Sequence, residues 1–265
     1  MAVVVAAPVL AACDTTTATP PATGSGHGTA HTPAATEPAR PLKLALKLPG
    51  TLPSQALTQG ATVPDTSGAG HDGTVQTSPT AGVSLQPISG RTGTTNAVQF
   101  LDPCTAGATC PKAIIEVPDS PAFVPGPADF AFGADVMLTN AQTSDGSNVV
   151  QKGFSTGGGS QWKLQVDHTA GAPSCIVVGT TADTRYVAWA STSIADGAWH
   201  EVRCSRTGET LTILVDGVQR GKAQLPAGLE VRPQGPVRIG GKNLRPTNDQ
   251  YFGAVSDVYY GTYLP

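Results

Sequence analysis

The chain has 265 residues, of which 31 are glycine and 23 are proline, and only 13% are charged. Glycine and proline destabilise helices and exposed helix faces are usually rich in charge, so this composition argues against a helical bundle. The net charge of −3 gives no basic excess for a nucleic-acid partner, and no apolar run approaches the ~20 residues of a membrane-spanning helix.

The first element predicted along the chain is an export signal. Residues 1–12 are uncharged and apolar or small, and they run directly into Cys13. This stretch has the length of a signal-peptide core, and Leu10-Ala11-Ala12-Cys13 is similar to a bacterial lipobox, whose cysteine is acylated and becomes the mature N-terminus. A positively charged segment before the core is missing, which leaves ordinary secretion, a start codon further upstream and a chance match as alternatives. We expect residues 1–13 to direct the protein to the extracellular face of a bacterial membrane as a lipoprotein, or to secretion.

A tether is predicted next. From Asp14 to Arg40 the chain contains no Val, Ile, Leu, Met, Phe, Trp or Tyr. Such a segment buries too little apolar surface to offset its chain entropy. We therefore expect residues 14–41 to be disordered and residues 42–265 to form the folded domain.

Alternating apolar residues mark where the folded domain begins. Leu42, Leu44, Leu46 and Leu48 alternate with polar or small residues, a pattern that predicts a strand with one buried face. All 14 aromatic residues lie at or after Phe100, which places the core in the last two-thirds of the chain.

Short apolar runs recur between turn signals in that region, and no apolar stripe with helical spacing accompanies them. The runs are Ala97–Leu101, Ala113–Val117, Phe130–Leu138, Val149–Lys152, Trp162–Val166, Cys175–Val178, Tyr186–Ala190, Trp199–Cys204, Leu211–Val215, Val237–Ile239 and Phe252–Tyr260. Asp216-Gly217 is a strong signal for a tight hairpin turn. Eleven candidate strands of this kind predict an all-β domain, most simply a two-sheet antiparallel jelly-roll sandwich.

The four remaining cysteines, Cys104, Cys110, Cys175 and Cys204, form an even set in a chain expected to be exported. Disulfides are the default in that setting, and three connectivities are possible. We favour Cys104–Cys110, which closes a short loop, and Cys175–Cys204, which joins two strand-like runs. Zinc is the competing interpretation, but the spacing lacks the paired cysteines of a zinc site.

Six stretches, taken in chain order, resemble the laminin-G-like and concanavalin-A-like lectin and glucanase family of jelly-roll domains. They are the Asp65–Val75 segment, Val98–Phe100 with Ile115–Pro121, Phe130–Val136 with Asp135 where tryptophan is usual, Gly197–Val202, the Leu211–Gly217 hairpin and Phe252–Val258. The resemblance covers about residues 62–265 and implies the sandwich fold. These residues build the fold and do not identify a ligand.

The resemblance also implies a structural calcium ion, which family members often carry. Asp65 and Asp72 in a glycine-rich segment, with Asp257 from a distant strand, supply the oxygen ligands that calcium prefers. The alternative is that Asp, Ser and Gly simply form a turn here.

A carbohydrate site needs aromatic faces for sugar rings and polar side chains for hydroxyl groups. Trp162, Trp189, Tyr186 and Asn148 are the candidates, with the loop 153–160 as a frame. The competing interpretation is that these aromatic residues pack in the core.

Catalysis finds little support, because the carboxylate pattern E-x-D-x-x-E of glucanases with this fold is absent, as are H-E-x-x-H and a phosphate-binding loop. We therefore predict an exported, lipid-anchored, non-catalytic module that binds carbohydrate or another extracellular surface polymer, and that contacts membrane through its lipid alone. A protein-interaction or structural module of the cell envelope is the alternative, followed by a glycan-active enzyme of the same fold.

Overall fold

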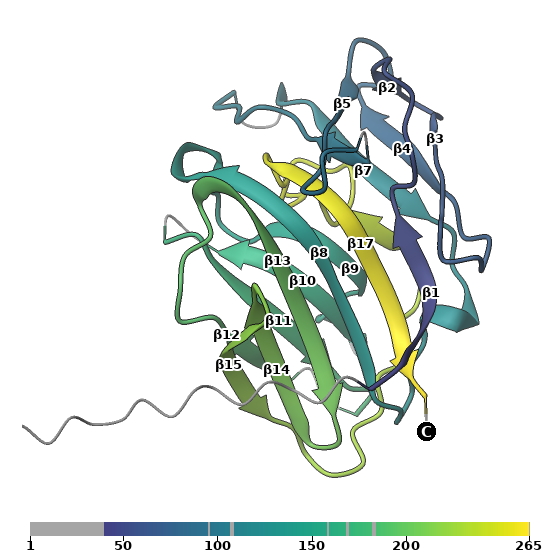
Figure 1. Cartoon of the computed structure of the whole chain (residues 1–265), viewed down its shortest axis with the longest axis vertical. Helices are drawn as coiled ribbons and strands as arrows, with labels where there is room; N and C mark the ends of the chain where they lie inside the picture. The colour runs from purple at the N-terminus through teal and green to yellow at the C-terminus, as the bar shows by residue number, and fades with distance from the viewer. Residues whose placement is uncertain are drawn as a thin grey trace, which may run out of the picture. The chain divides into compact units, whose positions relative to one another are not determined.

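The computed structural model describes residues 40–94, 96–106, 109–157, 159–167, 170–181 and 184–264. Cys13, the predicted signal peptide and nearly all of the predicted tether lie outside these residues. Within them, two antiparallel sheets face each other, as the all-β prediction requires (Figure 1). No helix in this part of the chain is long and apolar enough to cross a bilayer.

The first layer, which we name the β8 sheet, contains the longest strands. Its order is β15 (Val218–Gln224), β14 (Thr210–Val215), β13 (Asp196–Thr207), β8 (Phe130–Thr139), β17 (Ala254–Tyr263), β6 (Ala97–Gln99), β5 (Ser84–Ile88) and β2 (Leu57–Thr58), and β1 (Leu42–Leu48) also pairs with β17. Figure 1 shows β1 and β17, from opposite ends of the chain, side by side. The N-terminal strand is therefore fixed to the C-terminal strand.

The second layer, the β10 sheet, has the order β12 (Arg185–Trp189), β11 (Ala172–Val178), β10 (Gln161–Asp167), β9 (Ser147–Gly153), β16 (Val237–Ile239), β7 (Lys112–Val117), β4 (Gly73–Ser78) and β3 (Thr62–Val63). All its pairings are antiparallel. Non-consecutive neighbours such as β9, β16 and β7 show that the chain crosses repeatedly between the sheets, which is the connectivity of a jelly roll.

The sequence predicted most of these strands. Each of the eleven apolar runs overlaps a strand, and β14 and β15 pair across Asp216 and Gly217, whose φ angles of 51° and 73° are those of a tight hairpin turn. The short strands β2 to β5 were not predicted, because they carry isolated buried residues such as Val63 and Leu85 instead of apolar runs.

The first strand corrects one expectation. A bulge shifts the register of β1 between Leu44 and Leu46. Leu46 and Leu48 are consequently buried in the core, whereas Leu42 and Leu44 are half-buried and line a recess on the outer face. The prediction of one buried face for all four leucines is wrong, since a bulge inserts an extra residue and exchanges the faces beyond it.

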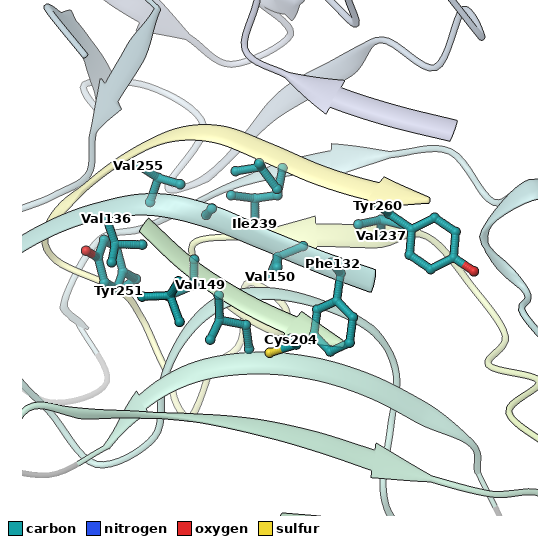
Figure 2. Packing of buried hydrophobic residues seen from close by; sticks show 14 of the residues in the cluster. Phe132, Val136, Val149, Val150, Cys204, Val237, Ile239, Tyr251, Val255 and Tyr260 are labelled. Carbon is teal, nitrogen blue, oxygen red and sulfur yellow. The ribbon is translucent and has the colours of Figure 1, made fainter. Parts of the chain in front are cut away.

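The core fills the space between the two inner faces (Figure 2). Phe132 and Tyr260 enter it from the β8 sheet, and Val150 and Val237 enter it from the β10 sheet. All four side chains are fully buried. Both sheets therefore present an apolar inner face, and any site for a polar ligand must lie on an outer face or at an edge.

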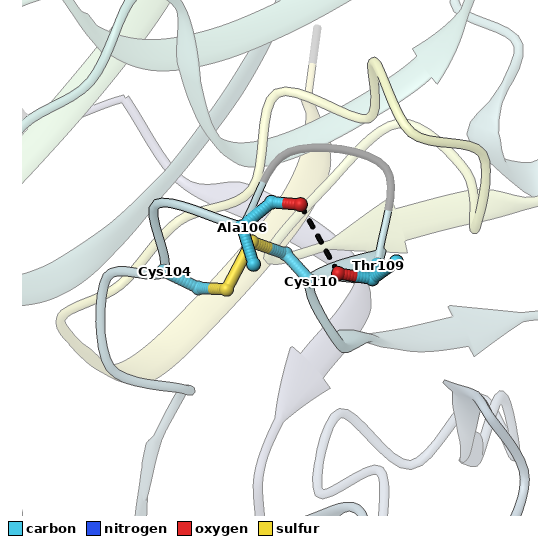
Figure 3. The surroundings of a disulfide bond; sticks show 4 residues. All are labelled: Cys104, Ala106, Thr109 and Cys110. Atoms are coloured by element: carbon cyan, nitrogen blue, oxygen red, sulfur yellow. Dashed lines mark hydrogen bonds between the residues drawn. A yellow bond between two sulfur atoms is a disulfide. The ribbon is translucent and has the colours of Figure 1, made fainter.

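Both predicted disulfides are confirmed. Cys104 and Cys110 close a small loop, in which the Thr109 hydroxyl also donates to the Ala106 carbonyl at 3.1 Å (Figure 3). Cys175 on β11 bonds to Cys204 on β13, so this bridge joins the β10 sheet to the β8 sheet.

Candidate functional site

Alternation along the β10 sheet decides which predicted residues share a face. The register aligns Trp189, Ser174, Gln165 and Asn148 in one row across β12, β11, β10 and β9. Residues that are direct neighbours across a sheet point to the same side. Trp189 and Asn148 therefore lie on the outer face, where Trp189 is 48% exposed at the edge and Asn148 is buried near the centre.

Trp162 and Tyr186 belong to another row, three residues further along the strands, which faces the core. The Trp162 ring is 0% exposed, stacks on Tyr260 with 5.0 Å between ring centroids, and donates its N–H to the Phe123 carbonyl at 3.1 Å. Tyr186 is partly buried and packs against the same core. The structure thus corrects the grouping of four ligand-binding residues, because two of them point to the opposite side of the sheet.

The outer face of the β10 sheet carries a recess of about 460 Å³. Side chains of β9 and β10 form its floor, and two loops form its walls. The floor residues are Gln151, Gln161, Lys163 and Gln165, and the walls include Phe154, Ser155 and Thr156 on one side and Lys242, Arg245 and Asp249 on the other. The predicted frame, the loop 153–160, contributes the first of these walls.

Hydrogen bonds hold the floor amides in fixed orientations. The Nε2 groups of Gln151 and Gln161 both donate to the Gly153 carbonyl, at 3.0 and 3.2 Å. Gln165 donates to both oxygens of Asp167, at 2.7 and 2.5 Å. Each of these three glutamines is at most 7% exposed. A polar floor that is oriented before a ligand arrives loses little entropy on binding.

Lys163 is the central charge of the floor. Its Nζ lies 3.9 Å from Oδ2 of Asp249, and Lys242 donates to the other oxygen, Oδ1, at 3.0 Å. Burial lowers the pKa of Lys163 to about 8, although the negative charges of Asp249 and Asp167 oppose this shift. Sequence reasoning missed this group, since Asp249 lies in a loop far along the chain from β10.

A second recess, of about 400 Å³, lies on the outer face of the β8 sheet. Each of its acidic side chains is paired with a basic one: Arg91 lies 3.5 Å from Asp135 and 3.6 Å from Glu201, and Lys47 lies 3.4 Å from Asp257. Burial raises the pKa of Asp135 to about 6, against the lowering effect of Arg91. Because these ion pairs already satisfy one another, the recess on the β10 sheet is the stronger candidate for a ligand.

The Asp65 loop was predicted to bind calcium, and its geometry shows another role. Oδ1 of Asp65 accepts from the backbone N–H groups of Lys47 and Ser67, each at 2.9 Å. Oδ2 accepts from the Ser67 hydroxyl at 2.7 Å and from the His71 N–H at 3.0 Å. A carboxylate has about four acceptor positions, so the chain itself occupies those of Asp65.

The other predicted calcium ligands do not complete a site. Oδ1 of Asp72 accepts from the Asp65 N–H at 2.8 Å, and Asp257 pairs with Lys47. Across the residues that the structure describes, no group of three or more His, Cys, Asp or Glu side chains is arranged to hold a metal ion. This donor set does not fit calcium. Asp65 instead organises its loop against β1.

We expect Asp65→Ala to lower the free energy of unfolding by about 1–3 kcal/mol, because it removes the acceptor of four hydrogen bonds. Partial burial opposes ionisation of Asp65, but its hydrogen bonds to His71, Ser67 and Lys47 outweigh it and lower the pKa below 3.8. A lowered pKa stabilises the native state above pH 3.8, and the contribution disappears as the pH falls towards the lowered value. Urea unfolding at pH 7 and pH 3 measures both effects.

Asp72→Ala is the matched control, since Asp72 accepts one hydrogen bond from this loop. Its effect at pH 7 should be clearly smaller than that of Asp65→Ala. Equal effects of the two substitutions, or a loss that is the same at pH 3 as at pH 7, would contradict the role assigned to Asp65.

A comparison with protein-family models identifies a family for this chain. The model described as Laminin_G_3, concanavalin A-like lectin/glucanases superfamily, matches residues 112–260. A search of curated proteins gives no significant match.

Solved structures with the same architecture include domain 4 of AbnA, a GH43 extracellular arabinanase from Geobacillus stearothermophilus, in complex with arabinotriose. It has 13% sequence identity and a TM-score of 0.56, over 84% of this chain and 95% of that domain. The binding domain of botulinum neurotoxin DC in complex with SialylT has 10% identity and a TM-score of 0.54, over 84% and 48%. The chain thus spans about half the length of that neurotoxin domain. At these identities the likeness shows the fold alone.

Proposed function

Because the chain belongs to the concanavalin A-like lectin/glucanase superfamily through its match to the Laminin_G_3 model, we propose that it is a non-catalytic module that binds a carbohydrate polymer. The proposed site is the recess on the outer face of the β10 sheet. The observation that carries the proposal is its floor of buried, oriented amide side chains.

The chemistry of the recess suits a sugar. Amide groups both donate and accept hydrogen bonds, as sugar hydroxyls do. The Phe154 ring at the wall is 40% exposed, and the Arg238 guanidinium lies 5.7 Å from its centroid on one side. A volume of about 460 Å³ falls within the ~300–1,000 Å³ typical of ligand pockets.

The face continues beyond the recess, which favours a polymer over a single sugar. The outer row that contains Gln165 extends through Ser174 to the exposed ring of Trp189 at the sheet edge. Phe154 follows Gly153, which pairs with Gln161 at the other end of β10, so a chain of several sugars that crosses the face diagonally would contact both Phe154 and Trp189. Two relatives in fold, the arabinanase domain with arabinotriose and the neurotoxin domain with SialylT, support carbohydrate as the ligand class.

We also propose that the module acts outside the cell, anchored by a lipid on Cys13. Two disulfides support an oxidising compartment, because such bonds are rare in cytosolic proteins. The proposed anchor would place the recess near polymers of the cell surface.

The test is a glycan-array and polysaccharide pull-down screen of the purified chain, followed by titration of the best ligand. We expect binding, and we expect Phe154→Ala to weaken it about 3- to 10-fold, since an aromatic contact contributes about 1 kcal/mol. Loss of the exposed ring should leave the melting temperature nearly unchanged.

Val218→Ala is the matched control, because Val218 is also 40% exposed but lies on β15 of the other sheet. It should leave binding unchanged. Failure to bind any glycan would refute the proposed function and favour a protein partner in the cell envelope. Equal losses of binding in the two variants would show that the recess is not the binding site.

A further inference from the structure

We propose that the recess on the β10 sheet selects an anionic sugar, one that carries a carboxylate or sulfate group, and that the ammonium groups of Lys163 and Lys242 bind this group. The inference rests on the proposed function and names the ligand class of the same site.

The charge of the recess differs from that of the whole chain. Its lining contains four basic side chains, Lys163, Arg185, Lys242 and Arg245, and one acidic side chain, Asp249. The chain as a whole carries a net charge of −3. Basic groups are therefore concentrated at this recess, and a cavity lined by one sign of charge attracts ligands of the opposite sign.

Among the residues that the structure describes, Lys163 has fewer partners than its ammonium group has donors. It is 9% exposed and lies in the middle of the sheet, between Gln151 on β9 and Ile176 on β11. An ammonium group has three donors, and a buried charge is costly unless it is paired and hydrogen-bonded. Within the described part of the chain its ion pair is with Asp249, at 3.9 Å, beyond hydrogen-bond distance.

The single carboxylate of Asp249 is shared by two lysines. Its Oδ1 accepts from Lys242 at 3.0 Å, and its Oδ2 faces Lys163. The carboxylate of Asp167 also acts on Lys163, but with Arg185 and Arg245 in the lining the basic side chains still outnumber these two carboxylates, which leaves a positive charge in the recess. An anionic group of a ligand between the two lysines would complete the set of ion pairs.

The surroundings of Lys163 favour a sugar acid over other anions. Three glutamine amides lie on the same floor, at Gln151, Gln161 and Gln165, and can pair with hydroxyl groups beside the anionic one. Four basic side chains line one recess of about 460 Å³, a shape that suits a sugar residue better than an extended nucleic-acid backbone.

The experiment measures binding of the full chain to three polymers by calorimetry: polygalacturonate with carboxylates, dextran sulfate with sulfates, and neutral dextran. We expect polygalacturonate or dextran sulfate to bind at least tenfold more tightly than dextran. Lys163→Met should weaken binding of the anionic polymer about 10- to 100-fold, because a hydrogen bond to a charged group is lost. Lys222→Met, at an exposed position of β15, is the control and should have no effect.

A second variant distinguishes an effect of charge on binding from an effect of lost structure. Asp249→Asn removes the internal carboxylate, and asparagine tolerates the φ angle of 52° at this position. We expect it to strengthen binding of the anionic polymer about fivefold or more. A merely structural role for the Lys163–Asp249 pair would instead give a loss.

The outcomes distinguish the two proposals. If dextran binds as well as the anionic polymers, or if Lys163→Met weakens both alike, the anionic preference is wrong and the carbohydrate site stands. If a glycan array and all three polymers give no binding, the proposed function fails. Tighter binding to single-stranded DNA than to either anionic polymer would overturn the sugar as ligand class.

Discussion

Trp162→Ala is expected to lower the free energy of unfolding by about 3–5 kcal/mol, the range for removal of a large buried aromatic side chain. The indole is fully buried between Phe132 and Tyr260, with its centroid 5.0 Å from each ring. Its removal would also leave the Phe123 carbonyl without its donor. For a domain of this size the melting temperature should fall by about 6–20 °C.

Two further variants make the prediction specific. Trp189→Ala removes the same side chain from a 48% exposed position, and its effect on stability should stay within about 0.5 kcal/mol. Trp162→Phe keeps an aromatic ring in the core, should remain folded if the alanine variant does not, and should bind glycan as the wild type does. If the Trp162→Phe protein folds and melts like the wild type but does not bind glycan, Trp162 takes part in ligand binding after all.

Local sequence determined most of the elements. Strand positions were predictable because short apolar runs alternate with turn residues, and each run marks a place where a strand can bury one face. The disulfides were predictable for a similar reason, since Cys175 and Cys204 each lie within such a run. Strands β2 and β3, with two residues each, carry no such pattern and depend on neighbours that are distant in sequence.

The assignment of Trp162 and Tyr186 to a ligand site went wrong although the sequence held the relevant signal. In the stretch 161–167 polar and apolar residues alternate strictly, which places Trp162 with Leu164 and Val166 on the apolar face. Tyr186 and Trp189 are three residues apart on one strand, so they point to opposite faces.

The charges of the recess could not have been assembled from the sequence. Lys163 lies on a strand, whereas Lys242 and Asp249 lie in the loop between β16 and β17. Their proximity depends on β16 pairing with β9, which brings this loop beside β10. The same holds for Asp65, because its hydrogen bond from Lys47 requires β1 to lie beside the loop.

Replacement of Cys175 and Cys204 by alanine is expected to destabilise the domain by about 3–4 kcal/mol. The two cysteines are 29 residues apart, and a closed loop of this length restricts the unfolded chain by about that amount. Both are 0% exposed, so alanine also leaves a small cavity, whereas serine would bury a hydroxyl group. Thermal unfolding of the double variant, and of the wild type with reductant, measures the effect.

The double variant Cys104→Ala/Cys110→Ala is the matched control. Its bridge spans six residues, for which the same relation gives about 2 kcal/mol. This bridge also closes a local loop, whereas Cys175 and Cys204 join β11 of one sheet to β13 of the other. The Cys175 pair should therefore cost more stability than the Cys104 pair. The reverse order would show that native contacts across the sandwich, and not restriction of the unfolded chain, hold the two sheets together.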